Sequence, residues 1–207
     1  MSIRNDSPAS SGTRDAVVGT EGPGITDRVL DAARSCLIRA AGGKVTLAEV
    51  ARVAGVSRPT VYRRWPDVAS VTGELVTREM ASVVAAVPVG GTCLEDKVDR
   101  LVAVAEAIRC NDLFGVLWRE PSTALAPYVF VRLGKSQRAL LALLQRAIAD
   151  GQRRGDVRPG APDQLAAMVL LICQSAIQSH AIVEPILGEA WSVELRHALK
   201  SYLRRDR

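Results

Sequence analysis

The sequence predicts an all-α protein. Apolar residues recur at helical spacing in successive stretches, Gly and Pro interrupt these stretches, and no convincing alternation of apolar and polar residues indicates a strand. Hydrophobic residues make up 48% of the 207-residue chain, which is enough for a real core, but only 4% of residues are aromatic. We therefore expect about nine helices, arranged as a three-helix head with a helix-turn-helix and a larger helical bundle.

Residues 46–65 predict two short helices joined by a tight turn. Thr46 stands in the N-cap position of the first helix, with Glu49 three residues further on as a capping-box partner. Gly55 follows the last apolar position, where a left-handed turn is easiest for glycine, and therefore ends this helix. The apolar residues at helical spacing are Leu47, Val50, Ala51 and Ala54.

The second helix of this motif carries a basic outer surface. Ser57 is its expected N-cap, and Pro59 lies in the first turn, where its missing N–H costs nothing. Val61 and Trp65 are four residues apart and can both turn inward. The side chains that face outward to varying degrees are Arg58, Thr60, Tyr62, Arg63 and Arg64. Such a set suits a DNA major groove; the alternative is a surface helical hairpin with solvated arginines.

The stretch from Leu47 to Trp65, followed by Pro66 and Asp67, resembles the DNA-binding domain of TetR-type transcriptional regulators. The detailed match covers about residues 26–75 and includes a Tyr-x-x-aromatic signature that ends at Trp65. The resemblance implies a helix before the motif and a long fourth helix after it. It also implies an all-helical ligand-binding and dimerisation domain.

One position departs from the family pattern. Family members often have a lysine that binds phosphate at the start of the fourth helix, whereas this chain has Val68. Another cation would have to replace that contact, and the candidates are Arg63, Arg64 and Lys44.

The resemblance and the outward-facing set together give the expected DNA contacts. The residues expected to face bases are Arg58, Pro59, Thr60 and Arg63. The residues expected to hold phosphates are Thr46, Ser57, Tyr62, Arg64 and Lys44. Loss of Arg58 should relax sequence specificity, whereas loss of Arg64 should weaken binding to all sequences alike.

The charge distribution agrees with a DNA-binding head. The chain has a net charge of +5; residues 1–66 contain ten Lys or Arg against six Asp or Glu, and the remainder contains seventeen against sixteen. We expect residues 1–24 to form a disordered arm, in which Arg4 and Arg14 either contact a minor groove or remain free. The expected domains are then a head over 25–70 and a regulatory domain over 71–207.

The second half of the chain predicts further helices and a dimer interface. We expect a helix from Pro127 to about Arg154, and a helix after Pro162 that is apolar nearly all round and is stopped by Pro185. The last helix has an apolar stripe that includes Leu195 and Leu199. The final helices thus have more apolar surface than one small bundle covers. We expect residues about 163–205 to pair with a second copy, as in the TetR family.

A ligand pocket is expected where helical stripes face one another around the aromatic segment after residue 111. The candidate walls are Leu101, Val104, Ile108, Phe114, Leu117, Trp118, Tyr128, Leu141, Leu144, Met168, Leu171, Ile172 and Gln174. The alternative for each residue is simple core packing. Gln174 and Ser175 are polar residues in an apolar helix, so they either pair across the dimer or face polar atoms of a ligand.

No motif for catalysis, a cofactor or a metal site is present. The sequence lacks G-x-S-x-G, P-loop, H-E-x-x-H and dinucleotide-binding patterns. Its cysteines, Cys36, Cys93, Cys110 and Cys173, are scattered, so each is expected to be a packing residue, with a thiol sensor as the alternative. Neither an apolar signal core nor a membrane-spanning run appears, which favours a cytoplasmic location.

These observations together favour a homodimeric repressor that binds a palindromic operator in double-stranded DNA. A small hydrophobic or amphipathic effector would release it. Two alternatives remain: a dimeric DNA-binding regulator without a ligand, and a helical carrier of hydrophobic molecules that does not bind DNA.

Overall fold

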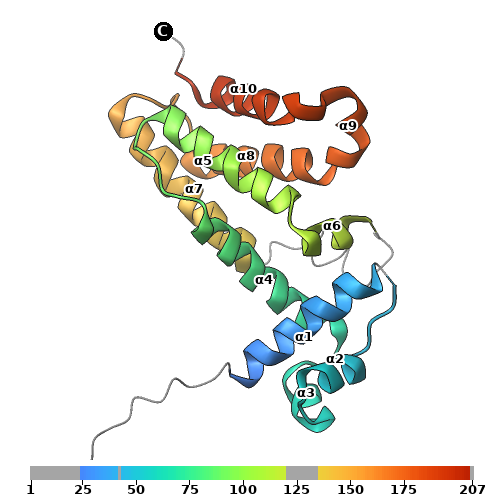
Figure 1. The fold of residues 1–207 in the computed structure, drawn as a ribbon. Coiled ribbons are helices and arrows are strands. Elements are labelled where there is room, and N and C mark those ends of the chain that lie inside the picture. Colours follow the sequence, from blue (N-terminus) through green and yellow to red (C-terminus); the bar gives the residue numbers. More distant parts are fainter. Residues whose placement is uncertain (1–23, 42, 120–134, 206–207) are drawn as a thin grey trace, which may run out of the picture.

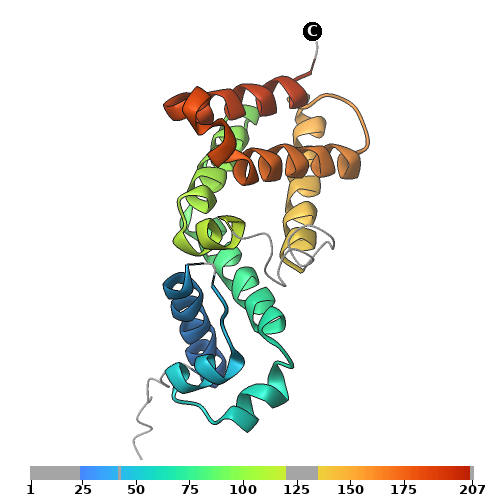
Figure 2. The ribbon, with the colours of Figure 1, turned by 90° about the vertical axis from the view of Figure 1, so that its right-hand side faces the viewer.

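The computed structural model describes residues 24–41, 43–119 and 135–205, and within these ranges it contains helices and no β-sheet. The all-α class is therefore confirmed. Figures 1 and 2 show a small head, a larger body and one helix, α4, that runs between them. The helices are α1 (Ile25–Ala40), α2 (Leu47–Ala54), α3 (Arg58–Arg64), α4 (Val68–Ala86), α5 (Leu94–Arg109), α6 (Asp112–Arg119), α7 (Lys135–Arg154), α8 (Pro162–Gln178), α9 (His180–Leu187) and α10 (Trp191–Leu203), with a 3-10 turn at Gly188–Ala190.

The head packs around the inner face of α1. The apolar side chains of this face are buried, with Val29, Ala33, Cys36 and Leu37 each at most 7% exposed. Helix α1 begins at Ile25, with Gly24 as its N-cap residue, and the carbonyl of Gly24 accepts the N–H of Arg28. The same core also includes Leu113 and Leu117 of α6, so the first helix of the head contacts the body directly.

Helix α4 belongs to both cores. It starts at an Asp67 cap: the carboxylate accepts the Ser70 N–H at 2.7 Å, and the Ser70 hydroxyl accepts the Asp67 N–H. Near its start Leu75 is fully buried in the head core, and near its end Met80 packs against the body core. Val76 contacts both cores. The long connecting helix predicted from the sequence is therefore packed into both parts.

In the body, α8 and α10 lie against α5, and α7 packs on α8. The end of α8 differs from the prediction, because the helix ends at Gln178 and the chain bends by 76° before continuing. Pro185 lies inside the next helix, α9, rather than stopping α8. The part of the expected helix between Pro127 and residue 134 lies outside the described residues, as does the N-terminal arm.

The apolar stripe of α10 faces inward. Leu195 is 5% exposed and Leu199 is fully buried, and both belong to the body core. Their expected place in a dimer interface was therefore wrong, since α5 and α8 already cover this side of the helix.

Among the described helices, none is by itself both long and apolar enough to cross a bilayer. Two consecutive helical segments, Pro162–Gln178 and His180–Leu203, together have the length and apolar composition of a membrane span, but they are bent by 76° where they join.

The burial of Leu199 gives a stability prediction. Leu199→Ala should lower the free energy of unfolding by about 2 to 5 kcal/mol, because it removes buried methyl groups and leaves a cavity. Urea denaturation at one fixed protein concentration measures this change. His197→Ala, a neighbouring substitution at an exposed position, should change the value by less than about 0.5 kcal/mol. Equal stability of the two variants would contradict the inward orientation of α10.

Candidate nucleic-acid interface

The helix-turn-helix forms through the caps that the sequence indicates. The Thr46 hydroxyl accepts the N–H of Glu49 at 3.2 Å, which starts α2. Gly55 has φ 63°, in the left-handed region, and ends that helix. The Ser57 hydroxyl accepts the N–H of Thr60 at 3.4 Å and lies 2.7 Å from the Thr60 hydroxyl. Because they bond to each other, these two hydroxyls hold the start of α3 in place.

Two buried side chains fix α3 against the rest of the head. Val61 is 0% exposed and Trp65 is 2% exposed, and both pack in the core that includes Leu47 and Ala51 of α2. The small side chain of Ala51 allows α2 and α3 to approach closely. The inward-facing set is therefore placed as predicted, and the opposite surface of α3 is left to the polar residues.

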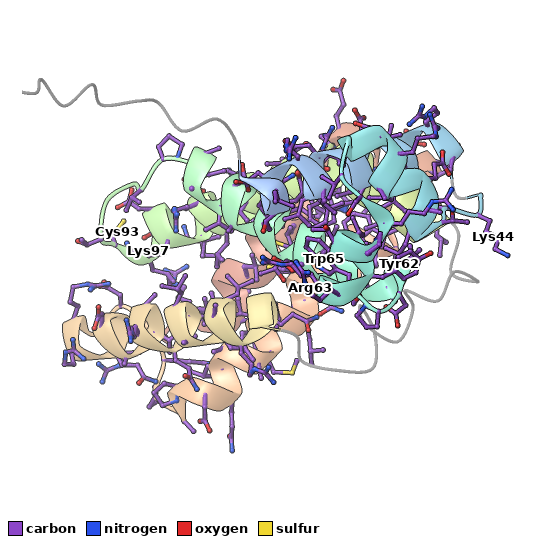
Figure 3. The ribbon with its side chains drawn as sticks, turned by 90° about the horizontal axis from the view of Figure 1, so that it is seen from below. Lys44, Tyr62, Arg63, Trp65, Cys93 and Lys97 are labelled. Atoms are coloured by element: carbon purple, nitrogen blue, oxygen red, sulfur yellow. The ribbon has the colours of Figure 1, made fainter. Side chains whose placement is uncertain are left out.

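The outer surface of α3 is exposed and basic. Tyr62 is 48% exposed, and Arg58, Arg63 and Arg64 are also exposed. Figure 3 looks at the molecule from the head end and shows Tyr62 and Arg63 on the near side, with Lys44 projecting at the edge. Of the remaining candidates, Thr46, Ser57 and Pro59 are exposed and Thr60 is half-buried.

The cations of this surface differ in their partners. Within the described part of the chain, Lys44, Arg58 and Arg63 form no ion pair with a carboxylate, so they can meet phosphates or bases. Arg64 instead lies 3.1 Å from a carboxylate oxygen of Glu74 on α4. Val68 packs against the head core, so it offers no substitute for the family lysine.

Ion pairs also join α4 to α1. An Nη atom of Arg78 lies 2.6 Å from Asp31 Oδ1, and Arg34 Nε lies 3.5 Å from Glu79 Oε1. These are partly exposed pairs, so each contributes little stability alone. Together with the shared core they keep α1 and α4 in one orientation.

Two of the expected ligand-pocket residues line a cavity within the described part of the chain. A cavity of about 30 Å³ lies between α5, α7, α8 and α10, and Leu101 and Leu144 are the only candidates that line it. Met168 and Leu171 are 42% and 57% exposed on α8 and do not line this cavity. The candidates buried or partly buried in the body core are Leu101, Val104, Ile108, Phe114, Trp118, Leu141, Leu144 and Ile172.

Three further candidates have other positions. Leu117 packs in the head core, Gln174 is half-buried, and Tyr128 lies outside the described residues. Phe114 and Trp118 stack with ring centroids 5.5 Å apart and both pack in the body core.

The cysteine thiols are free. Burial raises the pKa of Cys36 and raises that of Cys173 to about 11. A hydrogen bond to the Asp96 carboxylate raises the pKa of Cys93, which lies well away from Lys44 and Arg63 in Figure 3. A raised pKa keeps a thiol protonated and unreactive, which favours packing or capping roles over redox sensing.

The fold and the exposed basic surface of α3 define a helix-turn-helix DNA-binding protein. A family model described as "Bacterial regulatory proteins, tetR family" matches residues 29–69. The chain is 46% identical over 177 residues to an uncharacterized HTH-type transcriptional regulator of Mycobacterium tuberculosis, a match that covers 85% of this chain and 93% of that protein. The chain therefore belongs to the TetR family of transcriptional regulators, which are DNA-binding proteins and not enzymes.

Solved structures share this fold at low sequence identity. The complex of RolR with resorcinol matches with a TM-score of 0.68 and 15% identity over 88% of each chain. A complex of SmeT with triclosan matches with a TM-score of 0.63 and 18% identity over 88% of this chain and 92% of that one.

The exposed cations of the head give a prediction about specificity. Arg58→Ala should cost about 1 to 3 kcal/mol on a specific site and relax the preference at one base pair. Lys44→Ala should weaken specific and random DNA by the same factor, and should reduce the salt slope by about one. Fluorescence anisotropy titrations at several salt concentrations would measure both. If the two variants lower affinity for specific and random DNA in the same proportion, Arg58 does not contact a base.

Proposed function

We propose that this protein is a homodimeric repressor that binds a palindromic operator and is released by a small hydrophobic or amphipathic effector. The observation that carries the proposal is the exposed basic surface of α3, held on the buried anchors Val61 and Trp65. On this surface Arg58 and Arg63 form no ion pair within the described part of the chain. Each head would place α3 in a major groove, and a two-fold dimer would then require two symmetric half-sites. Such a regulator acts where the DNA is, in the cytoplasm.

The proposed contacts follow the exposure of each side chain. Arg58, Pro59, Thr60 and Arg63 would face base edges. Lys44, Tyr62 and Arg64 would bind phosphates, with Thr46 and Ser57 assisting from the two helix starts. Val68 stands where family members often have a lysine, and Lys44 and Arg63 would supply positive charge in its place. Selection of DNA from a randomised pool tests the proposal, because it should recover an inverted repeat rather than a single site.

The dimer interface is proposed on the outer face of the last helices, within residues 163–205. The inward stripe of α10 is already covered, but α8 exposes Met168 and Leu171, and α9 exposes Ile182 and Ile186, at 79% and 85%. An apolar surface of this kind is typical of an interface between copies of a chain. Ser175 is exposed on α8, which favours pairing across the dimer over contact with a ligand.

An effector site is proposed in the body, between α5, α7 and α8. Fold neighbours solved with resorcinol and with triclosan support a ligand-binding role for this architecture. The cavity of about 30 Å³ is far smaller than a typical ligand site of about 300 Å³ or more, so an effector bound there would have to separate the surrounding helices. The alternative is a dimeric regulator that responds to no ligand.

The dimer surface can be tested with two leucines of similar exposure. Leu171→Asp should give monomers in sedimentation experiments and abolish binding to the selected palindrome, because one head reads only half a site. Leu143→Asp provides the matched control, since Leu143 is 53% exposed on α7 and should remain in a dimer. A dimeric Leu171→Asp protein would place the interface elsewhere.

The effector can be tested with a thermal-shift screen of hydrophobic and amphipathic compounds. At a free concentration of about 100 times its Kd, a compound that binds the native protein should stabilise it by about 2.7 kcal/mol. An effector should also lower the protein's affinity for the operator. Bound operator should lower the protein's affinity for that compound by the same factor. Compounds that stabilise the protein without altering operator binding at saturation would argue for the regulator without a ligand.

A further inference from the structure

Arg64 is held differently from the other exposed cations of the head. Its Nη2 atom donates to Glu74 Oε1 at 3.1 Å, and its Cζ atom lies 5.0 Å from the ring centroid of Trp65. The guanidinium therefore has two partners within the protein, one on α4 and one at the end of α3. Its side chain is nevertheless 53% exposed, so the remaining N–H groups can still reach a phosphate.

Glu74 is itself fixed by a buried group. Its second oxygen, Oε2, accepts the indole N–H of Trp65 at 2.8 Å, and Trp65 is only 2% exposed. The carboxylate thus uses one oxygen for Trp65 and the other for Arg64. Its helix is anchored on both sides of this position by Val71 and Leu75, which are fully buried. Glu74 cannot follow Arg64 to a new position without breaking its bond to Trp65.

We propose that Glu74 is a positioning residue that tethers Arg64, so that Arg64 binds phosphate only when α3 is seated at its operator. The proposal rests on the placement of α3 in the major groove described above. An untethered arginine can reach phosphates in many registers and therefore strengthens binding to any DNA. A tethered one reaches a phosphate at a single place relative to the head, which random DNA seldom provides. Glu74 thereby adds to operator specificity without contacting a base.

This tether changes the expectation for Arg64. The sequence alone predicts that loss of Arg64 weakens binding to all DNA sequences alike. If Glu74 tethers Arg64, Arg64→Gln should lower the affinity for the operator several-fold and reduce the salt slope of operator binding by about one. Binding to random DNA should stay unchanged. The measurement uses the duplex that the wild-type protein selects and a scrambled duplex of equal length. Lys44→Gln is the control, which should weaken both duplexes. If Arg64→Gln also weakens both by the same factor, the proposal is overturned.

Substitution of Glu74 tests the same contact through its other partner and should strengthen binding to random DNA. Glu74→Gln keeps an oxygen that accepts the Trp65 N–H but loses the ion pair with Arg64. Affinity for the scrambled duplex should rise several-fold, with a salt slope larger by about 0.9. The same substitution in the Arg64→Gln background should produce no such rise. Glu49→Gln removes the same charge from another part of the head and should leave the ratio of operator to scrambled affinity unchanged.

The outcomes separate this inference from the proposed function. An equal rise in both backgrounds would show that Glu74 acts only through its charge, and would overturn the tether. A wild-type protein that selects no sequence would instead overturn the operator-binding function itself. Arg64 lies on the surface, so the Arg64→Gln arm gives its answer whatever Glu74→Gln does to folding.

Discussion

The position of α3, the second helix of the helix-turn-helix, depends on the burial of Trp65. This residue follows α3 directly, and its backbone N–H donates to the Val61 carbonyl while its indole packs in the head core. With Val61 and Trp65 both buried, only one orientation of α3 is compatible with the core, and that orientation leaves Arg58 and Arg63 outside. The basic surface is therefore a consequence of core packing, and the exposed charges are placed by residues that never touch DNA.

Helix α4 extends this constraint to the whole chain. It is buried in the head core at Leu75 and packs on the body core at Met80, and its polar side carries Glu74, which meets Trp65 and Arg64. A displacement of α4 relative to the body therefore acts on the head core and on a charged residue of the DNA-facing surface together. This shared packing provides a physical route by which events in the body can reach the DNA-facing surface.

Local features of the sequence predicted much of this arrangement, and long-range partners account for the rest. The caps at Thr46, Ser57 and Asp67 each depend on the residue three positions further on, so local spacing can indicate them. The Glu74 carboxylate meets groups nine and ten positions earlier in the chain across a turn between two helices, which no periodicity shows. Likewise, helical periodicity predicts the apolar stripe that includes Leu195 and Leu199. It does not tell whether the same chain or a second copy covers that stripe, and the structure shows that the same chain does.

Hydroxyl-radical footprinting of the selected operator would test the central claim most directly, that two copies of α3, each fixed by a buried Trp65, read the major groove. The account predicts two symmetric sets of protected sugars, with centres about 34 to 36 Å apart on one face of the duplex. Protection of a single patch, or of an uninterrupted stretch without symmetry, would contradict it.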